Sequence, residues 1–150
     1  MVKMAEYETS SKLRVILCRP DEYAEAAWIE DSLEAMQALV GGPIQEYMPF
    51  TGSDTRLDDL AIICNEEGKL MRLPPSRAIF DEDGQVMDII AGPFFICYAP
   101  IESETFMSLP EDLEKEFLKK FEKPEKFRRT ERGIEVIRFE PKSLERSEAR

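Results

Sequence analysis

The sequence predicts an α+β fold: a single domain in which two helices pack on one face of a mostly antiparallel sheet. Three observations predict it. Short apolar runs such as Leu13–Cys18 and Phe94–Tyr98 have the length and composition of strands. Gly- and Pro-containing turns separate these runs, while two further segments carry apolar residues at helical spacing. The length of 150 residues fits one domain.

The first part of the chain predicts a hairpin, a helix and a third strand. Leu13–Cys18 and Glu25–Glu30 are expected to pair in an antiparallel manner. Asp31 is expected to cap the first helix, because an acidic or hydroxyl side chain there can bind the free amides of the first turn. Pro43–Met48 follows as a half-buried strand. The helix face expected to be buried comprises Leu33, Met36, Leu39 and Val40.

The stretch Leu60–Tyr98 contains most of the remaining strand signals. Its first apolar run enters Asn65–Gly68, which predicts a hairpin turn closed by Gly68 at positive φ. Asp81–Gly84 predicts a second turn. A calcium loop beginning at its first residue would need a bidentate Glu at the twelfth position, which is Gly92, so a plain turn is expected.

Beyond this stretch the sequence predicts a second helix with Ser108 as its cap, followed by a basic arm. Gly133–Phe139 is expected to form a final strand. The predicted element order is β-β-α-β-β-β-β-α-β. The predicted organisation is a disordered lead-in over residues 1–11, an α+β domain over 12–122, and a basic C-terminal arm over 123–150 that holds the extra strand. The second helix should bury Leu113, Phe117 and Phe121.

Composition narrows the chemistry that the chain can perform. It contains no His, which removes every Ser-His, Cys-His and His-metal arrangement, and its three Cys are widely spaced within apolar runs. We therefore expect buried, reduced thiols and no metal or other cofactor. The net charge is −11, yet residues 115–150 hold 12 Lys and Arg against 8 Asp and Glu. An acidic body disfavours nucleic acid as a partner, except through the C-terminal arm.

Candidate ligand- or partner-binding residues lie in the central stretch, and each has a structural alternative. The segment 65–69 is either a hairpin turn or a site with carboxylates beside a Lys. The Pro74-Pro75 step is either a rigid crossover or a device that presents an Arg to a carboxylate or phosphate. Asp88 either caps the turn that follows it in the chain or joins the site. The candidate set is Asn65, Glu67, Lys69, Arg77 and Asp88.

Four motifs in order resemble one small family, a domain of unknown function carried by bacteriophages, plasmids and conjugative elements. The resemblance covers about residues 13–121, and its later motifs are CNEEGKL, LPPxRA and DIIAGxFFI. This chain has Ser76 where Asn is common and Pro93 where Thr is common, and it adds the arm. The resemblance implies a mobile-element setting, in which relatives accompany counter-defence proteins. The motifs are Asp31–Gly42, Cys64–Leu70, Leu73–Ala78 and Asp88–Ile96.

Three functions remain open from the sequence. The first is a non-enzymatic binding protein of a phage or mobile element, located in the bacterial cytoplasm, that modulates a host protein. The second is a site for an anionic small molecule or nucleotide, or an enzyme without His, that uses Glu67, Lys69, Arg77 and Asp88. The third is an acidic mimic of DNA. No signal peptide or membrane-spanning run is expected, hence no membrane partner. The sequence leaves the oligomeric state open.

Overall fold

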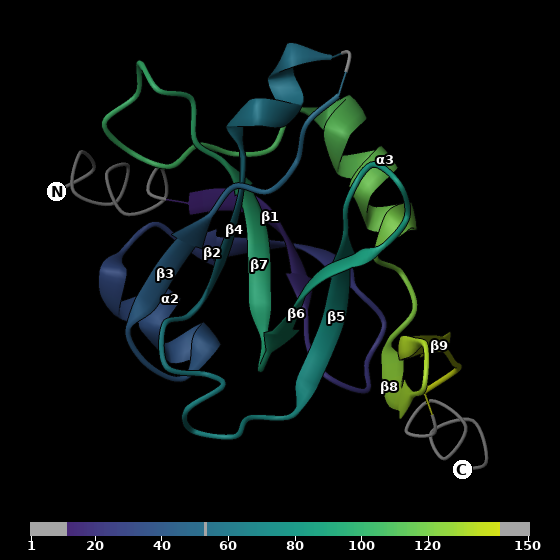
Figure 1. The fold of residues 1–150 in the computed structure, drawn as a ribbon. Helices are drawn as coiled ribbons and strands as arrows, with labels where there is room; N and C mark the ends of the chain where they lie inside the picture. The colour runs from purple at the N-terminus through teal and green to yellow at the C-terminus, as the bar shows by residue number, and fades with distance from the viewer. Residues whose placement is uncertain (1–11, 53, 142–150) are drawn as a thin grey trace, which may run out of the picture.

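The computed structural model describes residues 12–52 and 54–141 (Figure 1). The lead-in predicted over residues 1–11 and the last part of the predicted arm, residues 142–150, lie outside the described residues. The helices are α2 (Leu33–Val40) and α3 (Glu111–Lys120), with a 3-10 helix, η1 (Thr55–Asp59). The strands are β1 (Lys12–Cys18), β2 (Glu25–Glu30), β3 (Ile44–Tyr47), β4 (Leu60–Asn65), β5 (Pro75–Phe80), β6 (Val86–Ala91), β7 (Phe94–Tyr98), β8 (Glu125–Thr130) and β9 (Gly133–Arg138).

Five of these strands form one antiparallel sheet in the order β2-β1-β7-β4-β3. Every residue of β4 is buried, as is all of β7 except its last residue. These two strands carry almost unbroken apolar runs because both faces of the sheet are covered. The predicted α+β fold, a mostly antiparallel sheet with two helices packed on it in a single domain, is confirmed.

The two helices lie on opposite faces of this sheet, so the prediction that they share one face is wrong. Alternate residues of a strand point to opposite faces. Ile62 and Ile96 pack with Leu113 and the other buried residues of α3 on one face. Their neighbours in sequence, such as Ile63, pack with Met36 and Val40 of α2 on the other face. The core therefore consists of two layers separated by the sheet.

The ends of both helices differ in detail from the predicted caps. Ser32, and not Asp31, caps α2, because its Oγ accepts a hydrogen bond from the Ala35 amide at 3.1 Å. Ser108 does not cap α3; its Oγ accepts from the amide of Arg14 at 2.8 Å and so attaches the helix approach to β1. Leu33 is 56% exposed, in contrast to the burial predicted for it. Leu39 is only partly buried, while the other predicted helix residues lie in the core.

The chain leaves the sheet after β4. The segment 65–68 was expected to close a hairpin, but β5 pairs with β6 and not with β4. Gly68 does not adopt a positive φ. A Cβ there would lie 2.7 Å from the Ala91 carbonyl oxygen, so close backbone approach explains this glycine. The second predicted turn is confirmed: Gly84 has φ 80°, and Asp81 Oδ1 accepts from the amides of Asp83 and Gln85.

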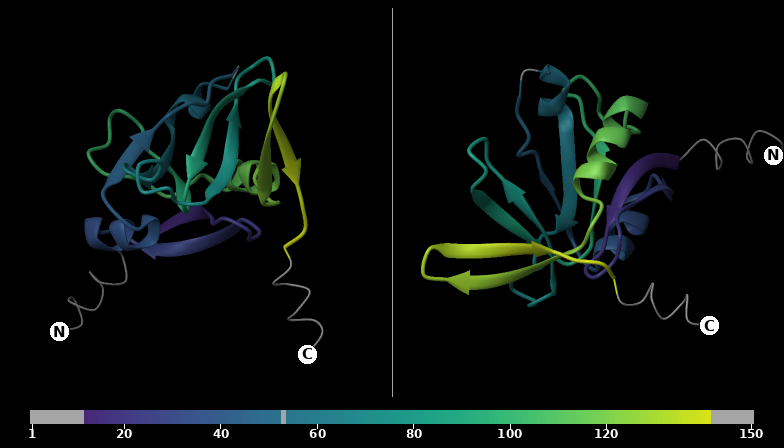
Figure 2. Two further views of the ribbon diagram at one scale, coloured as in Figure 1. Left: turned by 60° about the horizontal axis from the view of Figure 1, so that its bottom comes forward. Right: turned by 90° about the vertical axis from the view of Figure 1, so that its right-hand side faces the viewer.

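Two hairpins complete the described chain. The hairpin β5–β6 adds Ile79 and Ile90 to the core layer of α3. The hairpin β8–β9 projects from the body beside β5 (Figure 2). The structure thus has five strands between the helices against the four predicted, and two after α3 against one. Strand β8 was missed because its residues, EKFRRT, are too polar to give a strand pattern.

Candidate functional site

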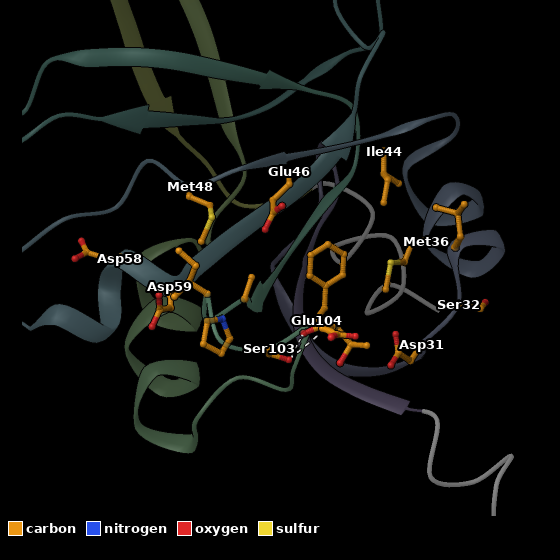
Figure 3. A pocket seen from close by; sticks show the side chains of 16 residues that line it. Asp31, Ser32, Met36, Ile44, Glu46, Met48, Asp58, Asp59, Ser103 and Glu104 are labelled. Atoms are coloured by element: carbon orange, nitrogen blue, oxygen red, sulfur yellow. Dashed lines mark hydrogen bonds between the residues drawn. The ribbon is translucent and has the colours of Figure 1, made fainter.

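A groove of about 930 Å³ lies beside β3, between the start of α2 and the loop that joins β7 to α3 (Figure 3). Such a volume falls in the range of ligand and peptide sites. We call this hollow the acidic groove. It is lined by Asp31, Ser32, Leu33, Met36, Ile44, Glu46, Met48, Asp58, Asp59, Ala99, Pro100, Ile101, Ser103, Glu104, Thr105 and Phe106.

The charges that line the acidic groove are all negative. Glu46 points from β3 toward Ser103 and Glu104 of the facing loop, while Asp31 lies at one end and Asp58 and Asp59 lie at the other (Figure 3). No Lys or Arg is among the lining residues. Like charges around a concave surface add to a local potential that attracts cations. The groove is therefore suited to a positively charged group.

Between the carboxylates the groove is apolar. Met36 and Ile44 belong to or border the core layer of α2, and both contribute to the lining. Ile101 is 94% exposed and Met48 is 40% exposed. Leu33, also in the lining, is 56% exposed, and several exposed apolar side chains around one hollow are typical of a contact surface. The groove thus combines apolar contact area with negative charge.

Hydrogen bonds hold η1 and the loop after β7 together at one end of the groove. The Ala99 amide donates to the Asp59 carbonyl oxygen at 2.7 Å, which fixes the end of η1 against the loop. A bridge between Tyr98 and Met107, with N–O distances of 3.0 and 2.7 Å, closes the base of this loop. Arg56 bonds both Asp54 and Asp112 and so fastens η1 to α3. The hydrogen bonds from Arg56 hold the pKa of Asp54 and of Asp112 below the usual range.

The predicted site residues of the central stretch lie on the other side of β3, and only some come together. Lys69 and Asp88 form an ion pair, with 2.5 Å between Nζ and Oδ1. Both line a small pocket of about 250 Å³, together with Asn65. Glu67 is exposed and does not line this pocket. Asp88 Oδ1 also accepts from the adjacent Ile89 amide, so it does not cap the turn that follows β6.

Asn65 has a structural role in the described fold. It is 5% exposed, and its side-chain amide donates to the Val40 carbonyl at the end of α2 at 3.1 Å. Its Oδ1 accepts from the Glu67 amide at 2.7 Å. These bonds tie the end of β4 to α2 and start the turn after the strand. The turn interpretation of this segment fits these bonds better than the site interpretation.

Arg77 is fully buried, so the interpretation that the Pro74-Pro75 step presents it to a ligand or partner is wrong. Its Nε donates to the Phe121 carbonyl at 3.0 Å, and Nη2 donates to the Glu22 carbonyl at 2.8 Å. Nη1 donates to the Arg19 carbonyl at 3.2 Å. Burial lowers the pKa of Arg77 from its usual value. The guanidinium joins β5, the β1–β2 loop and the end of α3, which is a structural role.

A buried carboxylate that acts electrostatically on Arg77 comes from the C-terminal arm. Glu125 at the start of β8 is 5% exposed, and its Oε1 accepts from the Ala78 amide at 2.8 Å. Its Oε2 accepts from Arg138 Nε at 3.1 Å. One carboxylate thus binds β8 to β5 and to β9. The arm predicted from 123 onward is attached to the domain by this buried contact.

The three cysteines are free and buried, as predicted. Burial raises the pKa of Cys18 to about 12 and raises that of Cys64. Burial also raises the pKa of Cys97, with Glu46 and Asp31 of the groove adding to the effect. A raised pKa keeps a thiol protonated and unreactive. These thiols belong to the core.

Sequence reasoning missed the acidic groove because its carboxylates come from distant segments and follow no local motif. The one available signal was the large acidic excess of residues 1–114. In residues 12–52 and 54–141, no three His, Cys, Asp or Glu side chains are grouped so that they could hold a metal ion. No helix in the same ranges is long and apolar enough to cross a membrane.

Comparison with known proteins gives one match. Residues 13–122 match the family model of DUF3846, described as a domain of unknown function. The matched part runs from the second residue of β1 to just past α3, includes every residue that lines the acidic groove, and ends before the β8–β9 hairpin. Neither a curated protein nor a solved structure matches the chain.

Proposed function

The chain belongs to the DUF3846 family, which has no assigned activity, and we propose that it is a non-enzymatic protein that binds a partner protein through the acidic groove. The observation that carries the proposal is the groove itself: five carboxylates surround exposed apolar side chains, and no basic residue lines it. Protein interfaces combine an apolar centre with a polar rim in this way.

Of the four residues suggested for a small-molecule site or an enzyme, Lys69, Arg77 and Asp88 are occupied by other contacts, and Glu67 is exposed outside the smaller pocket. Lys69 is paired with Asp88, so an anionic ligand would have to compete with that carboxylate. Arg77 donates to three backbone carbonyls of other segments inside the fold. The pocket beside Lys69, at about 250 Å³, is smaller than most ligand sites. These contacts favour the binding function over the second alternative.

The partner that we propose is a host protein with a basic surface. We infer a phage or mobile-element setting from the family resemblance, and in that setting such a protein would modulate a host factor in the manner of counter-defence proteins. The three reduced, buried cysteines suit the bacterial cytoplasm. A DNA mimic would also attract basic partners, but exposed apolar residues such as Ile101 favour a protein contact in which apolar area is buried.

The test is affinity capture from bacterial lysate with the wild type and groove variants, followed by quantitative mass spectrometry. Ile101→Asp removes the most exposed apolar contact, and Glu46→Lys reverses the charge at the centre of β3. Each change should reduce recovery of the specific partner at least tenfold. Glu116→Lys, an exposed change on α3 outside the groove, is the matched control for charge and should leave recovery unchanged.

Circular dichroism and thermal unfolding of each variant establish that the fold is retained. Equal recovery of the same proteins by the wild type and both groove variants would contradict the proposal. A partner that binds nucleic acid and is displaced by duplex DNA would favour the DNA-mimic alternative.

A further inference from the structure

The outer edge of β3 has backbone groups that bond to no strand of the described chain. β3 is the last strand of the five-stranded sheet. The Glu66 amide donates to the Pro43 carbonyl at 2.7 Å, which makes Pro43 and Glu66 a hydrogen-bonded pair. Because bonded and non-bonded pairs alternate in an antiparallel ladder, Gln45 and Tyr47 bond to β4. The amides and carbonyls of Ile44 and Glu46 therefore point away from the sheet.

This edge separates the two hollows described above. Ile44, Glu46 and Met48 line the acidic groove, and Figure 3 shows their side chains pointing into it. Gln45 and Tyr47 line the smaller pocket beside the Lys69–Asp88 ion pair. A strand added to this edge would continue the same alternation. Its side chains would enter the acidic groove and the smaller pocket in turn.

The charges of the two hollows differ, and this difference indicates the sequence that would fit. Every charged side chain that lines the acidic groove is a carboxylate, and apolar side chains lie between them, so it suits Lys or Arg alternating with aliphatic residues. In the smaller pocket the ammonium of Lys69 and the carboxylate of Asp88 neutralise each other, which leaves one further charge, the carboxylate of Glu66, against five carboxylates in the acidic groove. Uncharged side chains suit that side.

We propose that the partner binds by strand addition: an extended segment pairs with the outer edge of β3 and points basic and aliphatic side chains, at alternate positions, into the acidic groove. This inference rests on the proposed function and specifies the partner's chemistry. Exposed edges accept extended segments because the new backbone hydrogen bonds supply affinity, while pockets for alternate side chains supply specificity. A second copy of this chain fits less well, because pairing β3 with β3 brings two Glu46 carboxylates to one edge.

The first experiment selects seven-residue peptides from a random displayed library on the immobilised full chain. At every second position, the selected peptides should be enriched in Lys, Arg and aliphatic residues, which would enter the acidic groove. The positions between them should carry uncharged residues. Raising the salt from 50 to 200 mM should weaken the best peptide at least threefold. No enrichment over uncoated support, or enrichment in acidic peptides, would overturn the inference.

The second experiment tests the backbone pairing with the best selected peptide. Glu46→Gln removes the carboxylate and keeps the outward backbone N–H, whereas Glu46→Pro removes both the carboxylate and that N–H. Pro is tolerated at an edge when its missing N–H faces solvent, and β3 keeps its bonds to β4. The dissociation constant for Glu46→Pro should exceed that for Glu46→Gln at least fivefold. Glu30→Gln, which removes a carboxylate from the opposite edge strand β2, should bind like the wild type.

A peptide methylated at alternate backbone nitrogens should lose at least tenfold in affinity, because it can no longer donate to the edge. Equal affinity of the methylated peptide, or of the two Glu46 variants, would overturn strand addition. If the groove variants still lost the partner in the capture experiment, the proposed function would stand without strand addition. A concentration-dependent dimer of the free chain that Glu46→Pro abolishes would instead identify a second copy as the occupant.

Discussion

Replacing Arg77 tests whether its buried guanidinium stabilises the fold. In Arg77→Ala, the carbonyls of Arg19, Glu22 and Phe121 lose their donor. A buried acceptor left without a donor costs about 1 kcal/mol or more, and the cavity left by the aliphatic stem adds to this. We therefore expect the free energy of unfolding to fall by about 3–5 kcal/mol, in the range seen when one member of a buried charged network is removed.

Urea unfolding followed by far-UV circular dichroism measures this change, provided that the slope with denaturant stays constant. Arg77→Met separates the two contributions, because it fills most of the volume and donates no hydrogen bond. If lost bonds dominate, its cost should lie within about 1 kcal/mol of the alanine variant. Arg129→Ala is the control for an exposed Arg and should change stability by less than about 0.5 kcal/mol. A loss below about 1 kcal/mol for Arg77→Ala would refute the reasoning.

Three further predictions follow from the core and from η1. Phe117→Ala should lower the free energy of unfolding by about 3–5 kcal/mol in the same assay, because Phe117 is 2% exposed and contacts Phe50; a cost under about 1 kcal/mol would mean that α3 is not docked. The three buried cysteines should react with a thiol reagent only as fast as the protein unfolds, and fast labelling of one in native buffer would contradict their core placement. Carboxyl titration by NMR should place the pKa of Asp54 and Asp112 below 3.8, and Arg56→Gln should return both toward that value. Since these pKa values are depressed by folding, the ion pairs stabilise the protein above about pH 4 and lose that effect as the pH falls through the folded pKa values; unchanged titration in the variant would contradict this.

The sequence alone determined most of the elements of this protein. Apolar runs located β1, β4 and β7, because a strand buried on both faces needs apolar residues at nearly every position. The helical spacing of Leu113 and Phe117 marked the buried face of α3. These signals are local, so they can be recognised without knowing which segments pack against each element. The burial of all three thiols followed from their apolar neighbours in the same way.

Local signals located no residue of the acidic groove as part of a site; Asp31, Leu33 and Met36 were expected only as parts of the first helix. Lys69 and Asp88, 19 positions apart, belong to the candidate set named from the sequence, and they form an ion pair beside the smaller pocket. The same reasoning failed for Arg77, because the Pro74-Pro75 step leads into a strand whose Arg side chain is covered by α3 and the β1–β2 loop. A sequence pattern shows that an Arg is held in place. It does not show whether other segments cover it.

Only the tertiary structure decided where the helices lie and where the acidic groove forms. The helices lie on opposite faces because β4 and β7 carry apolar side chains on both faces of the sheet. Strand pairing determines this arrangement, and helix periodicity does not. The groove brings together Asp31, Glu46 and Glu104, of which the first and the last are more than 70 positions apart in the chain. Their proximity results from the pairing of β3 with β4 and from the closure of the loop after β7. Long-range contacts of this kind leave no periodic trace in the chain.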